Sequence, residues 1–134
     1  MALFVDTSAL YALIDRNDPV HGLAASTLGE VVRLELLLTH NYVVVETIAL
    51  VERRLGRAGV DKLLDEILPV VETTWIDRDT HESVVSAYRG ASAHASFVDH
   101  TSFEFMRLQE LRTAFAFDAD FRTAGFDLVP SRAA

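Results

Sequence analysis

The sequence predicts an α/β protein, a three-layer sandwich with a mainly parallel central sheet. Short apolar runs alternate with amphipathic helical stretches along the 134 residues, and no internal repeat is found. The first apolar run, ALFV at 2–5, lacks the polar alternation of a half-exposed strand, as expected where both faces of a parallel strand are covered. The length and a hydrophobic content of 50% suit a single domain over residues 1–134.

The first half of the chain predicts two strands, each followed by helix. Asp6, Thr7 and Ser8 offer capping oxygens directly after the first strand. The run VVV at 43–45 alone would suit a strand, but the later apolar spacing favours a helix that stops at Gly56. The elements expected here are a strand at 2–5, helices at 9–15 and 20–33, a strand at 34–39 and a helix at 42–55.

The second half continues the alternation with shorter elements. Pro69 is expected to end one helix, while Asp79 and Asp99 are expected to cap two others. The small and polar run GASAHAS predicts a loop. The elements expected here are a helix at 61–68, a strand at 70–76, a helix from Asp79 to Arg89, a helix at 101–111, a strand at 113–117, a loop at 117–121 and a strand at 126–129.

Acidic residues repeatedly stand where an apolar strand ends or a helix begins. Asp6 follows ALFV, Glu46 follows NYVVV, Asp99 follows SFV, and Asp118 follows AFAF with Asp120 two residues later. Each one alone is explained as a helix cap, a turn residue or a solvated helix residue. Ligands of parallel sheets bind beyond the carboxyl ends of the strands, so we expect the carboxylates to converge there. Converging carboxylates repel one another, and a hard cation such as Mg²⁺ or Mn²⁺ usually holds them together.

Composition narrows the functional classes. The formal net charge of −8 argues against nucleic-acid binding, because proteins that bind nucleic acids usually have a basic surface. Cations held by several of the acids would, however, reverse the local electrostatic field. The absence of cysteine excludes disulfides and thiolate metal sites. No apolar run approaches the ~20 residues that span a bilayer, and the N-terminus lacks a signal-peptide pattern. We therefore expect a cytoplasmic protein with no membrane partner.

At its acidic residues the chain resembles a PIN domain, and in particular a VapC-type toxin ribonuclease. The resemblance spans nearly the whole chain, in the family's order, through FVDTSALYAL at Asp6, HNYVVVETIAL at Glu46, SFVDHTSFEFM at Asp99 and AFAFDADFRTAGF at Asp118. It implies a metal-dependent endoribonuclease that acts on single-stranded RNA with Mg²⁺ or Mn²⁺. It also implies a parallel sheet, a homodimer and a cognate antitoxin protein.

With this resemblance, roles can be assigned to the five acids. We expect Asp6 and Asp99 to be the main direct metal ligands, with Asp118 completing the site directly or through water. Glu46 suits a second metal position or the orientation of the attacking water. Asp120 is a reserve ligand, with a simple loop role as the alternative.

Three further residues are candidates for substrate binding. At ~100° per residue, Arg53 and Arg57 return to within about 20° of the Glu46 direction, so they are candidates to contact RNA phosphate or an acidic part of an antitoxin. A solvated helix end, where arginine complements the helix dipole, explains them as well. Ser8, beside Thr7, is a candidate to contact the scissile phosphate, and capping alone accounts for it equally.

Two other classes stay open. In an Asp-based phosphohydrolase of the haloacid-dehalogenase type, a second Asp would stand where Ser8 is, and a receiver domain would place a lysine at a strand end, whereas Lys62 lies in a helical stretch. A catalytically silent PIN-like interaction module is the other alternative. Neither a GxGxxG motif nor a P-loop is present. Trp75 is expected in the core, and His21 and His40 are expected to be structural.

Overall fold

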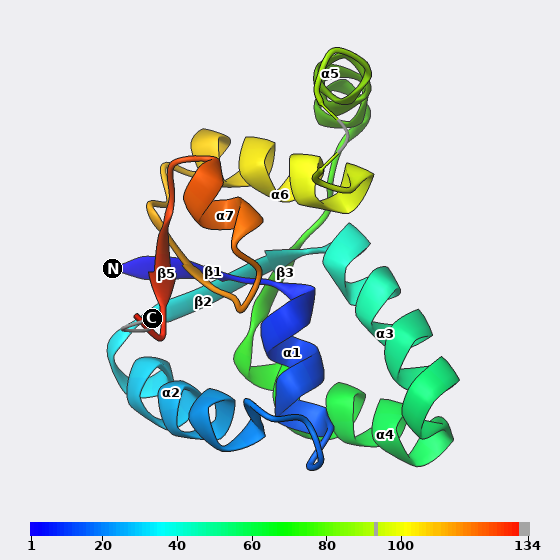
Figure 1. The fold of residues 1–134 in the computed structure, drawn as a ribbon, viewed down its shortest axis with the longest axis vertical. Coiled ribbons are helices and arrows are strands. Elements are labelled where there is room, and N and C mark those ends of the chain that lie inside the picture. The colour runs from blue at the N-terminus through cyan, green and yellow to red at the C-terminus, as the bar shows by residue number, and fades with distance from the viewer. Residues whose placement is uncertain (93, 132–134) are drawn as a thin grey trace.

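The computed structural model describes residues 1–92 and 94–131, and its centre is a five-stranded sheet (Figure 1). The strands lie in the order β3-β2-β1-β4-β5, and every neighbouring pair is parallel. The predicted α/β fold with a parallel sheet is therefore confirmed. The strands are β1 (Ala2–Val5), β2 (Leu36–His40), β3 (Glu72–Thr74), β4 (Thr113–Phe115) and β5 (Asp127–Val129).

Helices cover both faces of this sheet. Their bounds are α1 (Thr7–Ile14), α2 (His21–Leu34), α3 (Asn41–Leu55), α4 (Arg57–Lys62), α5 (Arg78–Arg89), α6 (Phe97–Leu108) and α7 (Asp120–Thr123). Helices α5, α6 and α7 lie on one side and α1, α2 and α4 on the other, while α3 stands near the end of the sheet where β1 stops (Figure 1). Within the described residues, every helix is too short or too polar to cross a membrane.

The central strand β1 carries the core and fixes the position of Asp6. Its pairing with both β2 and β4 buries Leu3, Phe4 and Val5, which are at most 3% exposed. The Phe4 ring stacks on Phe121, with the ring centroids 5.8 Å apart. Because β1 lies between two other strands, the residue that follows it emerges in the middle of the sheet's carboxyl edge.

Helix α3 confirms the helical interpretation of the VVV run. Its buried residues Val43, Thr47 and Val51 are spaced by four, which is one helical turn. His40 caps the start, since its Nδ1 accepts a hydrogen bond from the Val43 N–H at 3.3 Å. Gly56, with φ of 79°, ends the helix in the left-handed region that glycine tolerates.

The helix expected at 61–68 begins earlier and does not end before Pro69. It starts at Arg57 as α4 and continues through two short turns, η1 (Leu63–Ile67) and η2 (Leu68–Val70). Pro69 lies at the start of η2, where the first turn of a helix needs no N–H donor from it. Proline here therefore marks a change of helix type instead of a stop.

Two predicted caps are wrong by a few residues. Asp77 caps α5 in place of Asp79, because its carboxylate accepts from the Thr80 N–H at 2.8 Å. Ser96 caps α6 in place of Asp99. Its hydroxyl accepts from the Asp99 N–H at 3.0 Å, while Asp99 Oδ2 accepts from the Ser96 N–H at 3.3 Å. This reciprocal capping box fixes Asp99 in the first turn of α6.

Strand β3 is shorter than the strand expected at 70–76, and Trp75 lies outside the core. The chain leaves the sheet directly after β3, where the Ile76 N–H donates to Asn41 Oδ1 at 2.7 Å. Trp75 is consequently 73% exposed. The expectation that it belongs to the core is wrong, because β3 is an edge strand that pairs with β2 alone.

Strand β4 is also shorter than the strand expected at 113–117. The Phe117 N–H donates to Ser8 Oγ at 2.9 Å and so leaves the sheet for the start of α1. The loop expected at 117–121 is a turn that opens the short helix α7. Both differences bring the residues after β4 toward the end of β1.

Candidate active site

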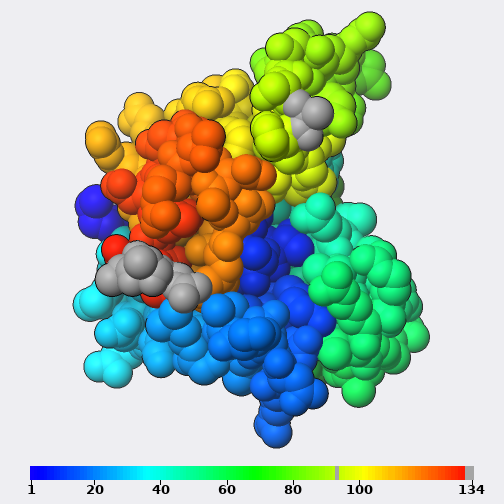
Figure 2. Space-filling model, in the orientation of Figure 1, coloured from blue at the N-terminus to red at the C-terminus, as the bar shows by residue number. Residues whose placement is uncertain are grey.

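The structure brings the predicted acids together at the carboxyl edge of the sheet. Asp6, Glu46, Asp99 and Asp118 line one cavity of about 290 Å³, together with Ser8. Figure 2 shows the dark-blue start of α1 at the centre of this face, surrounded by segments from the rest of the chain. Residues that are distant in sequence thus share one acidic hollow.

Asp6 combines a capping role with a place in the cavity. The Ser8 N–H and the Ser8 hydroxyl both donate to Asp6 Oδ2, at 3.1 and 2.7 Å. The residue is only 3% exposed, and this burial raises the pKa of its carboxyl to about 6. The Ser8 hydrogen bonds lower that pKa, whereas the charge of Asp118 raises it.

Asp99 is the acid whose charge is most disfavoured by its surroundings. Burial and then the charges of Asp6, Asp118 and Glu46 raise the pKa of its carboxyl, and the Ser96 N–H lowers it; together they give a pKa of about 7. A carboxylate beside several others behaves in this way when no opposite charge compensates. The cavity therefore concentrates negative charge.

Asp99, Asp118 and Asp120 form the tightest group of acids. Each offers one oxygen, and these three oxygens lie within 4.8 Å of one another. Asp118 Oδ1 accepts from the Asp120 N–H at 2.9 Å, so the turn after β4 fixes both side chains. Asp120 was expected only as a reserve ligand, but the structure groups it with Asp99 and Asp118. Asp6 and Glu46 line the same cavity as Asp99 and Asp118.

Glu46 reaches the cavity from the middle of α3. Thr7 Oγ1 donates to Glu46 Oε1 at 2.6 Å, which joins α1 to α3. Thr47, one residue further along α3, directs its hydroxyl to the Val43 carbonyl at 2.7 Å and to Thr7 Oγ1 at 3.3 Å. One oxygen of Glu46 therefore has a fixed position.

The chemistry of the cavity fits a divalent cation. Within residues 1–92 and 94–131 the one ion pair joins Arg107 to Glu104, so the clustered acids have no basic partner there. Carboxylate oxygens are the ligands that Mg²⁺ and Mn²⁺ prefer, and a cation would relieve the repulsion that raises the pKa of Asp99. The residues present thus suit a hard metal ion.

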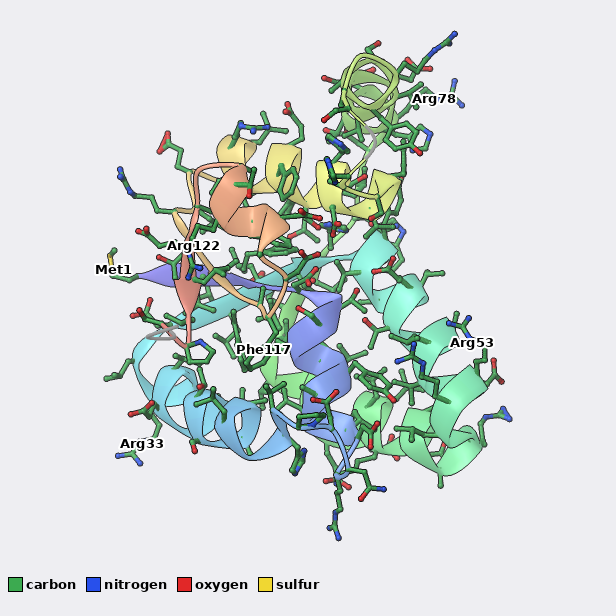
Figure 3. The ribbon with its side chains drawn as sticks, in the orientation of Figure 1. Met1, Arg33, Arg53, Arg78, Phe117 and Arg122 are labelled. Atoms are coloured by element: carbon green, nitrogen blue, oxygen red, sulfur yellow. The ribbon has the colours of Figure 1, made fainter. Side chains whose placement is uncertain are left out.

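The two candidate arginines lie outside the cavity. Arg53 and Arg57 are both exposed, and Figure 3 shows Arg53 on the outer side of α3. Gly56 separates Arg57 from α3, so the helical spacing from Glu46 does not apply to it. The expectation that Arg57 shares one helix face with Glu46 is therefore wrong. Contact of either arginine with RNA stays a prediction.

His21 and His40 have structural contacts. The Nδ1 of His21 lies 2.7 Å from the Ala12 carbonyl oxygen. His40 is fully buried, with Nε2 2.9 Å from Ser102 Oγ, and burial lowers its pKa to about 3. Neither residue lines the carboxylate cavity.

Sequence reasoning missed the hydroxyl groups that hold the acids. Thr7 holds Glu46, and Ser96 holds Asp99. The Ser96 signal was present in the sequence, because Ser-x-x-Asp before an apolar stretch is the spacing of a capping box. No comparable local signal links Thr7 to Glu46, 39 residues away.

The fold and the acidic cavity define a PIN domain. The family model described as PIN domain matches residues 3–127, and the chain belongs to this family. The chain is 36% identical over 126 residues to the 23S rRNA-specific endonuclease VapC20 of Mycobacterium tuberculosis. The alignment covers 92% of this chain and 95% of that protein.

Solved structures agree with this assignment. The crystal structure of M. tuberculosis VapC20, described as a Sarcin-Ricin loop cleaving toxin, matches with a TM-score of 0.84 and 34% identity over 93% of this chain and 96% of that one. VapBC2 from Rickettsia felis, bound to a promoter DNA fragment, matches with a TM-score of 0.73 and 11% identity over 96% and 97% of the two chains. At that identity the similarity shows the fold alone.

Proposed function

We propose that this chain is a metal-dependent endoribonuclease that hydrolyses phosphodiester bonds of RNA, and that it is the toxin of a toxin–antitoxin pair. The observation that carries the proposal is the convergence of Asp99, Asp118 and Asp120 within 4.8 Å, beside Asp6 and Glu46. The similarity to VapC20, which is named as a 23S rRNA endonuclease, supports RNA as the substrate.

The proposed cofactor is Mg²⁺ or Mn²⁺. Asp99, Asp118 and Asp120 would hold the ion, with Asp6 and Glu46 contributing directly or through water. When bound, the ion supplies Lewis-acid activation of water and neutralises charge on the phosphate.

The protein's own hydroxyl groups orient this acidic site. Ser8 holds one oxygen of Asp6, and Thr7 holds one oxygen of Glu46. We assign Glu46 to orienting the attacking water, because the Thr7 bond gives its carboxylate a fixed position on the cavity wall. The family resemblance further suggests products with 5′-phosphate and 3′-hydroxyl ends.

The proposed protein partners are an antitoxin and a second copy of this chain, in the cytoplasm. A basic antitoxin segment complements the acidic cavity electrostatically. Val45 and Trp75 are apolar side chains that are 66% and 73% exposed, and they are candidate contacts for a protein partner. Arg53 and Arg57 are proposed contacts of RNA or of the antitoxin, and unchanged affinity of Arg57→Ala for both would remove Arg57 from that role.

The nuclease proposal is tested with a mixed, structured RNA substrate in Mg²⁺ or Mn²⁺. We expect the wild type to cut it and Asp99→Asn to leave it intact. Asp79→Asn is the matched control, since Asp79 is exposed in the first turn of α5. Absence of both cutting and calorimetric metal binding would favour a silent interaction module instead.

A further inference from the structure

A second cavity is lined in part by Asp120, which belongs to the group of three acids. Its volume is about 500 Å³, against 290 Å³ for the carboxylate cavity. Its walls come from the loop between α5 and α6, from α6 and from α7. Figure 2 shows the orange α7 region and the yellow-green segment before α6 next to each other on this face.

Asp120 is shared by the group of three acids and the second cavity. Its carboxylate belongs to the group of three acids, and the residue also lines the second cavity. A polymer whose backbone is bound at the acids can therefore place its neighbouring unit in the second cavity. This adjacency is what an endonuclease would use to recognise the nucleotide beside the bond that it cuts.

His100 in the wall of this cavity has an unsatisfied nitrogen. The His100 ring packs against Tyr88 and Phe103, with both centroid distances 5.7 Å. Its Nε2 is shielded from solvent and has no hydrogen-bond partner among the described residues. Because this nitrogen is shielded from solvent, it does not face the open cavity, and His100 contributes other atoms to the wall.

The remaining wall has the chemistry of a nucleobase site. Phe103 and several alanines give it an apolar surface, while Arg107 supplies a guanidinium at its edge. Arg107 is exposed, and its contact with Glu104 is long, at 3.8 Å. A flat ligand with apolar faces and hydrogen-bonding edges suits such a wall better than a bare phosphate, which would require more cationic groups.

We propose that the second cavity receives one unstacked base of single-stranded RNA, next to the phosphodiester held at the acids, with Arg107 contacting the edge of the base. The proposal rests on the proposed nuclease function for the identity of the polymer. It assigns base selection to α6, α7 and the loop before α6.

The test is the affinity of the full chain for fluorescein-labelled single-stranded RNA octamers in Ca²⁺, measured by anisotropy, with intact RNA verified on a gel. Ala91→Trp fills the cavity from its exposed rim, while Arg107→Gln removes the proposed edge contact. Arg33→Gln is the matched charge control, since Arg33 lies in the last turn of α2 at the lower left of Figure 3.

We expect Ala91→Trp and Arg107→Gln each to weaken octamer binding at least fivefold, and Arg33→Gln to leave it unchanged. An octamer without bases should bind all forms equally. Equal octamer binding by all forms, or equal losses with the abasic octamer, would overturn the base site.

The outcomes separate this proposal from the nuclease itself. Cleavage that depends on Asp99, combined with normal octamer binding by the cavity variants, leaves the nuclease and removes the base site. Base-dependent binding without cleavage by any form leaves the base site and removes the nuclease.

Discussion

Thr7 Oγ1 donates a hydrogen bond of 2.6 Å to Glu46 Oε1 and so joins the first turn of α1 to the middle of α3. Because Thr7 directly follows Asp6, the same turn positions two of the carboxylates in the cavity. The geometry of the site therefore depends on neutral side chains as well as on the acids.

The first prediction concerns Thr7→Val, which keeps the branched shape and removes the donor. We expect kcat for RNA cleavage to fall about tenfold or more, as is typical when a group that orients a catalytic ligand is lost. The free energy of unfolding should change by less than about 1 kcal/mol, because half-buried Glu46 can bond to water instead.

Thr27→Val is the matched control for this change. The Thr27 hydroxyl donates to the Leu23 carbonyl at 2.8 Å within α2, away from the acids. Its cleavage rate should equal that of the wild type. An unchanged kcat in Thr7→Val would show that Thr7 does not position Glu46 for the reaction.

The second prediction concerns Ser8→Ala. The Ser8 hydroxyl donates to Asp6 and accepts from the Phe117 N–H, so its removal leaves a half-buried N–H without this partner. We expect a loss of about 1–3 kcal/mol in the free energy of unfolding, measured in urea, together with reduced cleavage. Ser26→Ala, which removes an exposed hydroxyl bond to Gly22 in α2, should cost far less. Equal losses in the two variants would contradict the linking role of Ser8.

The third prediction is a pH dependence of stability without metal. The folded-state pKa values of Asp6 and Asp99, about 6 and about 7, lie above the ordinary 3.8. The folded protein therefore holds more protons than the unfolded chain between these pH values. The contribution of these two groups to the free energy of unfolding is fully present below about pH 4 and is lost as pH rises through 6 and 7.

Asp99→Asn removes one of these groups. In EDTA at pH 8 we expect its Tm to exceed that of the wild type by several degrees, which corresponds to about 1 kcal/mol in a domain of this size. The difference should shrink toward pH 4. Mn²⁺ should raise the Tm of the wild type more than that of the variant, by mass action. A difference in Tm that does not change with pH would contradict the repulsion among the acids.

The fourth prediction separates Asp120 from a simple loop role. Asp120→Asn should weaken Mn²⁺ binding about tenfold or more in calorimetry, because it replaces an oxygen anion of the close group of three acids. Asp127→Asn, an exposed change in β5, should leave Mn²⁺ affinity unaltered. Identical affinities in the two variants would return Asp120 to the loop role.

Strand β1 and helix α3 could be predicted because their signals are local. An uninterrupted apolar run followed by Asp6 describes a buried strand and its exit. The apolar spacing in the second half of 42–55 indicated the helix, whose buried residues in the structure are Val43, Thr47 and Val51. The convergence of the acids also followed from the sequence, since the ends of parallel strands meet at one edge.

The remaining features depend on contacts between distant segments. Trp75 could not be placed, because the point where an edge strand leaves the sheet depends on the hydrogen bond between Ile76 and Asn41. Asp120 joins Asp99 only because the turn after β4 and the capping box of α6 face each other in three dimensions. Neither contact can be predicted from the secondary-structure preferences of the neighbouring residues.

The most direct test of the metal-dependent ribonuclease is the initial rate of RNA cleavage as a function of Mn²⁺ concentration, for the wild type, Asp99→Asn and Asp79→Asn. We expect a rate that rises with Mn²⁺ and disappears in EDTA for the wild type and Asp79→Asn, and no cleavage by Asp99→Asn at any concentration. Cleavage that persists in EDTA, or that is equally fast in Asp99→Asn, would contradict a metal-dependent ribonuclease.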